Sequence, residues 1–439
     1  MSAKPAAPGS QQKRFAAYLD SLAQAVGHAD RIQPLKSYCT GLLLPGERKS
    51  VEPLAARVAP DNVRRTHQSL HHLVADAPWG DEILLGQVRS RVLPAMQKHG
   101  PVVGWIVDDT AFPKKGQHSV GVARQYCGQL GKQENCQVAV SLSVATWTSS
   151  LPIAYRLYLP EAWAADPKRR QKTGVPQDIA FETKPQIALG QIRRAVEADV
   201  ARGVVLADAA YGNDSGFRDG LRELQLHYVV GVQSSMTAWK PGAAPLPAKP
   251  WTGKGRPPRL LRRSGQHQPV SVEQLAQTLP AAAWKTVTWR QGTRHKLHSR
   301  FAALRVRPAH RDYWRAEPHA EEWLLIEWPP AASQPSKYWL STLPTATRLQ
   351  ALVKLAKHRW IIERDYEELK QELGLGHYEG RGWRGFHHHA TLCIAAYGFL
   401  VAERNRFSPS ARAGHVALPT AQIPSGFRPR GSPRSSRAA

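Results

Sequence analysis

Hydrophobic residues recur at helical spacing along the first hundred positions of the chain. Residues 14–28 and 81–100 place apolar side chains every three or four positions, and the second segment ends at Gly100-Pro101, a pair that stops helices. From residue 101 the pattern changes to short runs rich in Val, Ile, Leu, Tyr and Trp, which predict three strands over residues 102–109, 137–147 and 151–159. The pattern therefore predicts a helical N-terminal domain over residues 1–100 and a β-rich segment after it.

Helices and strands alternate over the next eighty residues. Helical spacing over 184–203 leads into a short apolar strand at 204–208, and a second helix and strand follow at 213–224 and 227–232. The predicted order from residue 101 is β-β-β-α-β-α-β, an α/β core. A right-handed crossover through its first helix makes the fourth strand parallel to the first, so both finish at one edge of the sheet.

The rest of the chain predicts a β-rich insertion and a return to helix. Residues 233–344 contain a Pro-rich basic segment at 254–263 and then strands rich in Trp. Spacing over 345–376 predicts one long helix, and we assign 345–405 to the last helices of the core. Residues 406–439 contain five prolines within an acid-free stretch, which predicts a disordered basic tail.

Charge points to a polyanionic partner. The 439 residues include 60 Lys and Arg against 34 Asp and Glu, a formal net charge of +26, which favours nucleic acid. The N-terminal residues lack the apolar core of a secretory signal, so we expect a cytoplasmic protein. The longest apolar run, residues 391–402, is about half the ~20 residues that a membrane span needs, so we expect no membrane partner.

Acidic residues follow two of the predicted strands. Asp108 and Asp208 end strands that are predicted to be parallel, so neighbouring strands would bring the two carboxylates together. Such a pair repels unless a hard cation lies between its members, and oxygen ligands suit Mg²⁺, with Mn²⁺ as a substitute. A role for each acid as a strand-end turn residue remains the alternative.

The predicted helix over 345–376 offers a third acid. Arg359, Glu363, Glu367 and Lys370 are spaced four, four and three apart, so they would share one helix face. The same spacing describes an ordinary ladder of ion pairs on a solvated helix, and periodicity leaves both interpretations open. If the acids do hold metal ions, they could activate a water or a 3′-hydroxyl for displacement at phosphorus, which implies DNA phosphodiester cleavage or strand transfer.

Several motifs together resemble the DDE transposases of bacterial insertion sequences. They are "DDT" at 108–110, "VVLADAAYG" at 204–212 and "RWIIERDYEELK" at 359–370, with "KKGQHSVGVARQYCGQLGK", "YLPEAWAADPKRR" and "HRWIIERDYEELKQELGLGHYEGRGW" similar to the DDE superfamily endonuclease subgroup. The resemblance covers roughly residues 30–405. It implies an RNase H-like mixed sheet flanked by helices, with the β-rich insertion placed before the last catalytic helix.

The resemblance also implies roles for individual residues. It assigns the catalytic, metal-holding acids to Asp108, Asp208 and Glu363, with Asp109 as the alternative to Asp108. Arg359 and Lys370 would hold phosphates at the transposon end. The tyrosine of the motif is replaced by Ala356, which removes that residue's phosphate contact and leaves the metal ligands unaffected.

Further expectations concern DNA and its partners. Lys114 and Lys115 follow the first strand and could meet a phosphate approaching the metals. The insertion would help to hold DNA ends, and one of its tryptophans could stack on a base or, for most of them, fill its core; the candidates are Trp284, Trp289, Trp323, Trp328 and Trp339. The resemblance implies terminal inverted repeats and target DNA as partners, a homodimer on paired ends and a nucleoid location.

Two other functions fit the same residues. One is a non-catalytic or domesticated basic DNA-binding protein on the same fold, and the other is a nuclease without strand transfer. Production of nicked DNA excludes the first, and joining of the freed 3′ end to a target excludes the second.

Overall fold

The computed structural model describes residues 9–292 and 296–406, and the chain divides into two compact units. A helical unit combines Met1–His99 with Glu368–Gly380 and Arg384–Ala439, and a second unit, here called the sheet unit, combines Gly100–Glu367 with Arg381–Trp383. The predicted basic tail lies, apart from residue 406, outside the described residues. The division predicted from the sequence has five parts, residues 1–100 as a DNA-binding domain, then 101–232, 233–344, 345–405 and 406–439, and it stays a prediction.

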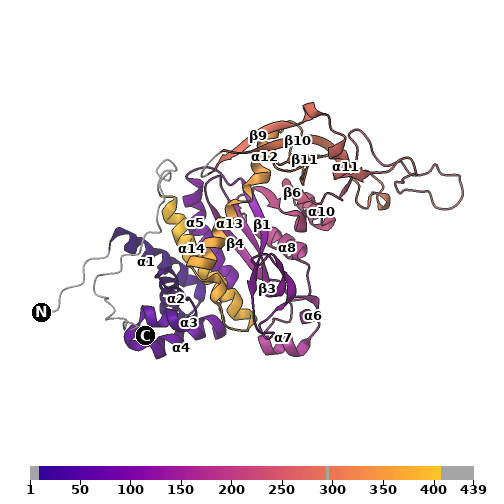
Figure 1. Cartoon of the computed structure of the whole chain (residues 1–439). Helices are drawn as coiled ribbons and strands as arrows, with labels where there is room; N and C mark the ends of the chain where they lie inside the picture. Colours follow the sequence, from indigo (N-terminus) through magenta and orange to yellow (C-terminus); the bar gives the residue numbers. More distant parts are fainter. Residues whose placement is uncertain (1–8, 293–295, 407–439) are drawn as a thin grey trace, which may run out of the picture. The chain divides into compact units, whose positions relative to one another are not determined.

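The helical unit confirms the helical spacing of the first hundred residues (Figure 1). Its main helices are α1 (Ser10–Ala23), α2 (Ala29–Leu43), α3 (Val51–Val58), α4 (Val63–His71), α5 (Asp81–Gln97) and α14 (Trp383–Arg404). The long, almost wholly buried α14 contains the apolar run at 391–402, so this run is core rather than membrane. None of the helices that the structure describes is long and apolar enough to cross a membrane.

The sheet unit is built on a mixed sheet whose strand order confirms the predicted RNase H-like fold (Figure 1). β3 pairs antiparallel with β1 and β4, while β5 pairs parallel with β1 and β6. The strands are β1 (Gly104–Pro113), β3 (Lys132–Ala145), β4 (Ser150–Leu157), β5 (Val204–Ala207) and β6 (Tyr228–Val232). The sequence pattern missed β2 (Ala123–Cys127), which forms a short hairpin with β3.

Helices pack on this sheet at the predicted places. α8 (Lys184–Glu197) packs on β3 and provides the crossover to β5, and α10 (Ser215–Glu223) connects onward to β6. Thr183 starts α8 with a capping box, in which its side chain accepts the N–H of Gln186. Three short helices complete this part of the unit, α6 (Glu161–Ala164), α7 (Pro167–Thr173) and α9 (Ala209–Gly212).

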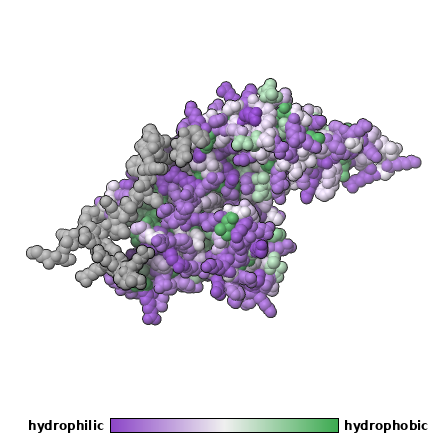
Figure 2. Space-filling model, in the orientation of Figure 1, coloured by the Kyte–Doolittle hydropathy of each residue, from purple (hydrophilic) through white to green (hydrophobic). Residues whose placement is uncertain are grey.

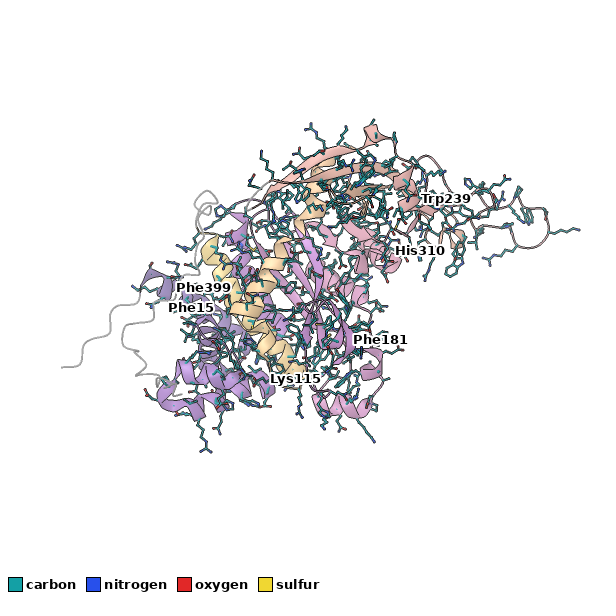
Figure 3. The ribbon with its side chains drawn as sticks, in the orientation of Figure 1. Phe15, Lys115, Phe181, Trp239, His310 and Phe399 are labelled. Carbon is teal, nitrogen blue, oxygen red and sulfur yellow. The ribbon has the colours of Figure 1, made fainter. Side chains whose placement is uncertain are left out.

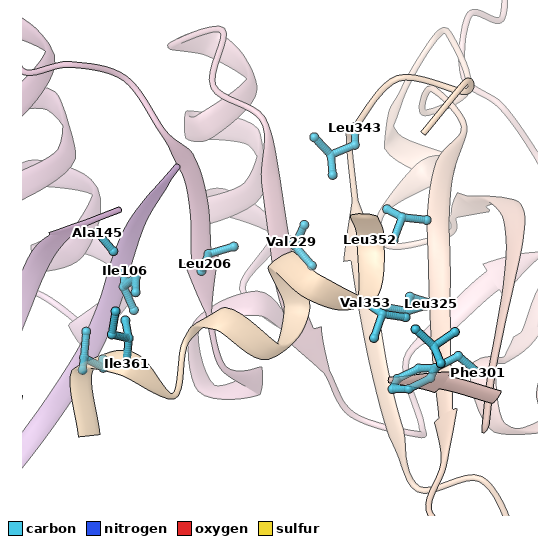
Figure 4. Packing of buried hydrophobic residues seen from close by; sticks show 12 residues of the cluster. Ile106, Ala145, Leu206, Val229, Phe301, Leu325, Leu343, Leu352, Val353 and Ile361 are labelled. Atoms are coloured by element: carbon cyan, nitrogen blue, oxygen red, sulfur yellow. The ribbon is translucent and has the colours of Figure 1, made fainter. Parts of the chain in front are cut away.

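The insertion is β-rich, as predicted, and its strands extend the core sheet, because β12 pairs antiparallel with β6. Its elements are β7 (Thr237–Trp239), β8 (Val270–Ser271), α11 (Val272–Gln277), β9 (Lys285–Gln291), β10 (Lys296–Pro308), β11 (Glu322–Trp328) and β12 (Lys337–Ser341). One apolar cluster runs from β1 and β5 through β6 to β10 and β11 (Figure 4). The insertion and the core therefore share a hydrophobic interior.

The single long helix predicted over 345–376 is wrong. The chain forms α12 (Leu349–His358), turns at residues 359–360, forms α13 (Ile361–Glu367) and continues as a π-helical turn, Glu368–Glu372. Contacts on both sides fix the turn, since His358 Nε2 lies 2.8 Å from the carbonyl oxygen of Thr146 and the Arg290 guanidinium lies 3.6 Å from the centre of the Trp360 ring. Tertiary contacts thus override a continuous helical pattern.

Two glycines let the segment after β5 approach β6 closely. A Cβ atom on Gly212 would collide with the carbonyl oxygen of Gly231, and one on Gly231 would lie 3.0 Å from the backbone nitrogen of Ala209. This contact holds the start of α9, and with it Asp208, against the sheet.

We predict that Gly212→Ala lowers the free energy of unfolding by about 2 kcal/mol, because backbone rather than a flexible side chain must move. Gly190→Ala in α8 is the matched control. Its new methyl would have only the Arg194 guanidinium within reach, at 3.8 Å, and should stabilise the helix by about 0.5–1 kcal/mol. Thermal unfolding of both variants checks this, and equal melting temperatures would contradict the close approach.

Candidate active site

The parallel pairing of β1 with β5 brings Asp108 and Asp208 to the same level. Gly104 pairs with Val204 and Ile106 with Leu206, an offset of 100 residues (204 − 104) that places Asp108 opposite Asp208 two positions further on. The expected proximity of these residues along the sheet is therefore confirmed. The expected strand end is not, because β1 continues to Pro113 while β5 stops at Ala207. At Asp108, β1 is no longer paired with β5 but is still paired with β3.

Asp108 is held by two donors. Its Oδ1 accepts the backbone N–H of Asp109 at 2.9 Å, and its Oδ2 accepts Nη1 of Arg359 at 2.7 Å. Burial raises the pKa of Asp108 to about 7; the Arg359 charge opposes the rise, and the charges of Asp208 and Asp109 add to it. Even with Arg359 beside it, the carboxyl group is therefore only about half ionised at neutral pH, and a further cation would be needed to ionise it fully.

Arg359 occupies the turn between α12 and α13 and links the three proposed acids. Burial opposes its charge, but its pKa is raised above the ordinary value because carboxylates compensate. These carboxylates are Asp108, Asp208 and Glu363. The guanidinium therefore provides the positive charge within a set of acids contributed by β1, the end of β5 and α13.

The other two acids are positioned by their local backbone. Asp208 is the N-cap of α9, and its Oδ1 accepts the N–H of Ala210 at 2.9 Å. Asp208 is therefore both a turn residue at the end of a strand and a neighbour of Asp108, so the two interpretations of this acid are compatible. Glu363 lies in the first turn of α13 and is exposed to solvent, so a ligand can reach it.

Asp109 points to a different partner. Successive side chains of a strand face opposite sides, and the carboxylate of Asp109 forms an ion pair with Lys184 at the start of α8. The pair connects β1 to the helix of the crossover. Because Asp109 is paired with Lys184 on the other face of the strand, Asp108 is the aspartate that we favour for the site.

Three hydroxyl groups lie near the acids, and sequence reasoning assigned a role to none of them. Ser141 is the cross-strand partner of Asp108 on β3, and its hydroxyl contacts that of Tyr366. Burial raises the pKa of Tyr211, with the charges of Asp109 and Asp108 adding to the rise, and its hydroxyl has no hydrogen-bond partner among the described residues. Both tyrosines lie in quoted motifs, three residues after Glu363 and three after Asp208, so motif position was the available signal.

Two lysines that the sequence placed near the metals lie away from this cluster. Lys114 and Lys115 follow the last residue of β1, roughly 20 Å from Asp108 at the usual rise of a strand. Figure 3 shows Lys115 at the opposite end of the sheet unit from Trp239 of the insertion. Arg359 precedes α13 and Lys370 falls in the π-helical turn that follows it, so the two residues do not share the face of one continuous α-helix that the sequence predicted.

The five tryptophans named from sequence are all partly buried. Trp284 and Trp328 make an edge-to-face pair with ring centres 5.2 Å apart, and cations cover several of the rings. In the described part of the insertion, sequence reasoning missed two exposed tryptophans, Trp251 at 55% and Trp314 at 62% exposure. The core interpretation therefore fits most of the five.

The three proposed acids suit a divalent cation in their chemistry. They offer only carboxylate oxygens, the ligands that Mg²⁺ and Mn²⁺ prefer, and they compensate one cationic group in this structure. Within residues 9–292 and 296–406, no three His, Cys, Asp or Glu side chains are close enough together to hold a metal ion as they stand. Binding of one metal ion by all three acids would therefore require at least one of their side chains to move.

Comparison with known proteins agrees with this fold. Residues 21–296, more than half of the chain, match the DDE superfamily endonuclease family, and the chain belongs to this family. The matched segment includes Asp108 and Asp208 and ends before Glu363. The chain is also 32% identical over 190 residues to a probable transposase for insertion sequence element IS701 from Microchaete diplosiphon. That similarity covers 43% of this chain and 46% of the relative, so the chain spans about half of the relative's length.

We expect Asp108→Asn to weaken Mn²⁺ binding by about tenfold or more, because even outer-shell changes at metal sites cost about 10–100-fold. Asp109→Asn should change the affinity by no more than about twofold, since its carboxylate binds Lys184. Isothermal titration of the two variants with Mn²⁺ measures this. A larger loss for Asp109→Asn would show that the neighbouring aspartate is the ligand.

Proposed function

We propose that this chain is an insertion-sequence transposase that cuts DNA strands at the element ends and joins them to a target. The observation that carries the proposal is the set of three acids, from β1, the end of β5 and α13, that compensate the buried charge of Arg359. Membership of the endonuclease family, the net charge of +26 and the transposase name of the relative support it.

The three acids would hold Mg²⁺, or Mn²⁺ in its place, through carboxylate oxygens. When bound, such a cation activates a water or 3′-hydroxyl and stabilises the leaving oxygen at phosphorus. Asp208 is held at the N-cap of α9 and Asp108 in a strand, so two of the three ligands stand on rigid elements. Glu363, being exposed, is the ligand that can adjust when DNA arrives.

Arg359 has donors to spare for DNA. One N–H of its guanidinium donates to Asp108, and no other residue that the structure describes accepts from the remaining four, so these are available for phosphate oxygens. A cation at Asp108 would also weaken the hold of that carboxylate on Arg359. We propose that Arg359 then binds a phosphate, with Lys370, Lys114 and Lys115 as further phosphate contacts.

The proposed partners follow from this reaction. They are the terminal inverted repeats of the element and the target DNA, with a homodimer holding paired ends. A protein acting on these DNAs would be located at the nucleoid.

We predict that Asp208→Asn and Glu363→Gln each lower strand nicking by roughly a thousandfold, because each removes a metal ligand. DNA binding should persist in a gel-shift assay at moderate salt. Glu367→Gln is the matched control, since it removes an exposed acid one turn further along α13 and should leave nicking unchanged. Nicking is measured on labelled duplexes that carry the inverted repeats flanking the gene, with Mn²⁺.

The products of the wild-type chain distinguish the proposed function from its alternatives. Retarded DNA without nicks would identify a non-catalytic binding protein. Nicked DNA whose 3′ end never joins a target would identify a nuclease. Unimpaired nicking by both acid variants would exclude these residues as the catalytic acids.

A further inference from the structure

We propose that residues 247–261, here called the basic loop, insert into the minor groove of duplex DNA. The inference rests on the proposed function only in taking DNA as the partner. It adds an A·T-preferring contact that lies outside the acidic site.

The basic loop is a long exposed excursion from the insertion. Every residue from 249 to 260 is exposed, and the segment contains turns but no helix or strand. It extends from the insertion beside α11 (Figure 1), and Figure 2 shows its surface as mostly hydrophilic. An exposed segment of this length without regular structure is typical of a binding element rather than a packed one.

Its charge is entirely positive. Between Glu223 and Glu273 the chain has no acidic residue, and the loop carries four cations, Lys249, Lys254, Arg256 and Arg259. None of these four forms an ion pair with a residue that the structure describes, whereas Arg263 at the base is paired with Asp312. The loop therefore presents cations that no protein carboxylate neutralises, which complements a polyanion.

The base of the loop is held firmly. Leu246 and Arg262 exchange backbone hydrogen bonds of 2.9 Å, and the N–H of Leu261 donates to the carbonyl oxygen of Arg315 at 2.9 Å. Arg263 Nη2 and Trp239 Nε1 both donate to buried Asp312, at 2.7 Å each. These hydrogen bonds hold both ends of the loop, so the loop leaves the sheet in one direction.

The tip has its own bracing. Gly253 and Gly255 adopt φ values of +83° and +72°, which other residues rarely tolerate. The indole N–H of Trp251 donates to the carbonyl oxygen of Gly255 at 3.2 Å and closes this turn. The cations thus project from a narrow, braced turn rather than from a random tether.

The proline content of the loop favours the minor groove of DNA over the major groove. Four prolines in fifteen residues prevent strand pairing, and Pro257 and Pro258 keep the residue before each of them extended. An extended chain with three residues per turn projects Arg256 and Arg259 to the same side, about 9 Å apart. The minor groove, about 6 Å wide, excludes a helix of about 10–12 Å but admits such a chain. Narrow A·T-rich grooves attract Arg most strongly, so the loop should prefer them.

The test uses the full chain, two 30-base-pair duplexes of equal length, one A·T-rich and one G·C-rich, and fluorescence anisotropy without divalent metal. The wild-type chain should prefer the A·T-rich duplex by about tenfold, and a minor-groove polyamide such as netropsin should compete. The Arg256→Ala/Arg259→Ala variant should lose most of this preference. The matched control is Arg193→Ala/Arg202→Ala, which removes two exposed arginines elsewhere in the sheet unit and should keep the preference.

The inference is overturned if the wild-type chain binds both duplexes equally, or if both double variants lose affinity to the same extent and retain the same preference. It is also overturned if netropsin leaves binding unchanged. Circular dichroism confirms that each variant is folded. Because no metal is present, the outcome of this test is independent of cleavage. A chain that prefers the A·T-rich duplex but never nicks DNA would contradict the proposed function and would still support this inference.

Discussion

The parallel pairing of β1 with β5 is the constraint on which the site depends. Its register, Gly104 with Val204, decides that the acids 100 residues apart come level with each other. A slip by one residue would turn one of them to the other face of the sheet. The close approach of Gly212 to Gly231 keeps the segment after β5 against β6, so the register is supported on both sides of β5.

The ion pair between Asp108 and Arg359 connects this sheet edge to the late helices. The two side chains are only 16% and 30% exposed, so each charge depends on the other. Removing one partner of a buried pair leaves an uncompensated charge, which usually costs about 3–5 kcal/mol. The same dependence gives the site a way to respond to ligands, because a metal cation and a DNA phosphate together could replace both halves of the pair.

Sequence reasoning anticipated much of this fold for physical reasons. Hydrophobic period separated helices from strands, and the handedness of crossovers placed Asp108 and Asp208 at one sheet edge. It failed where tertiary contacts decide the outcome. The turn at Arg359 interrupts a continuous helical pattern, β1 runs five residues past Asp108 because β3 continues beside it, and Ser141 reaches the site only through strand register. Tyr366 lies in a quoted motif, but no role was assigned to it, and Lys184 had no distinguishing spacing.

We propose that Asp108, Asp208 and Glu363 share a cation position and that Arg359 supplies the compensating positive charge in this structure. Anomalous X-ray scattering from crystals soaked in Mn²⁺ tests this proposal, because it locates the metal independently of the protein atoms. We predict a Mn²⁺ peak within about 2.5 Å of carboxylate oxygens of Asp108 and Asp208, with Arg359 displaced from Asp108. A peak coordinated by Asp109, with the ion pair between Asp108 and Arg359 intact, would contradict it.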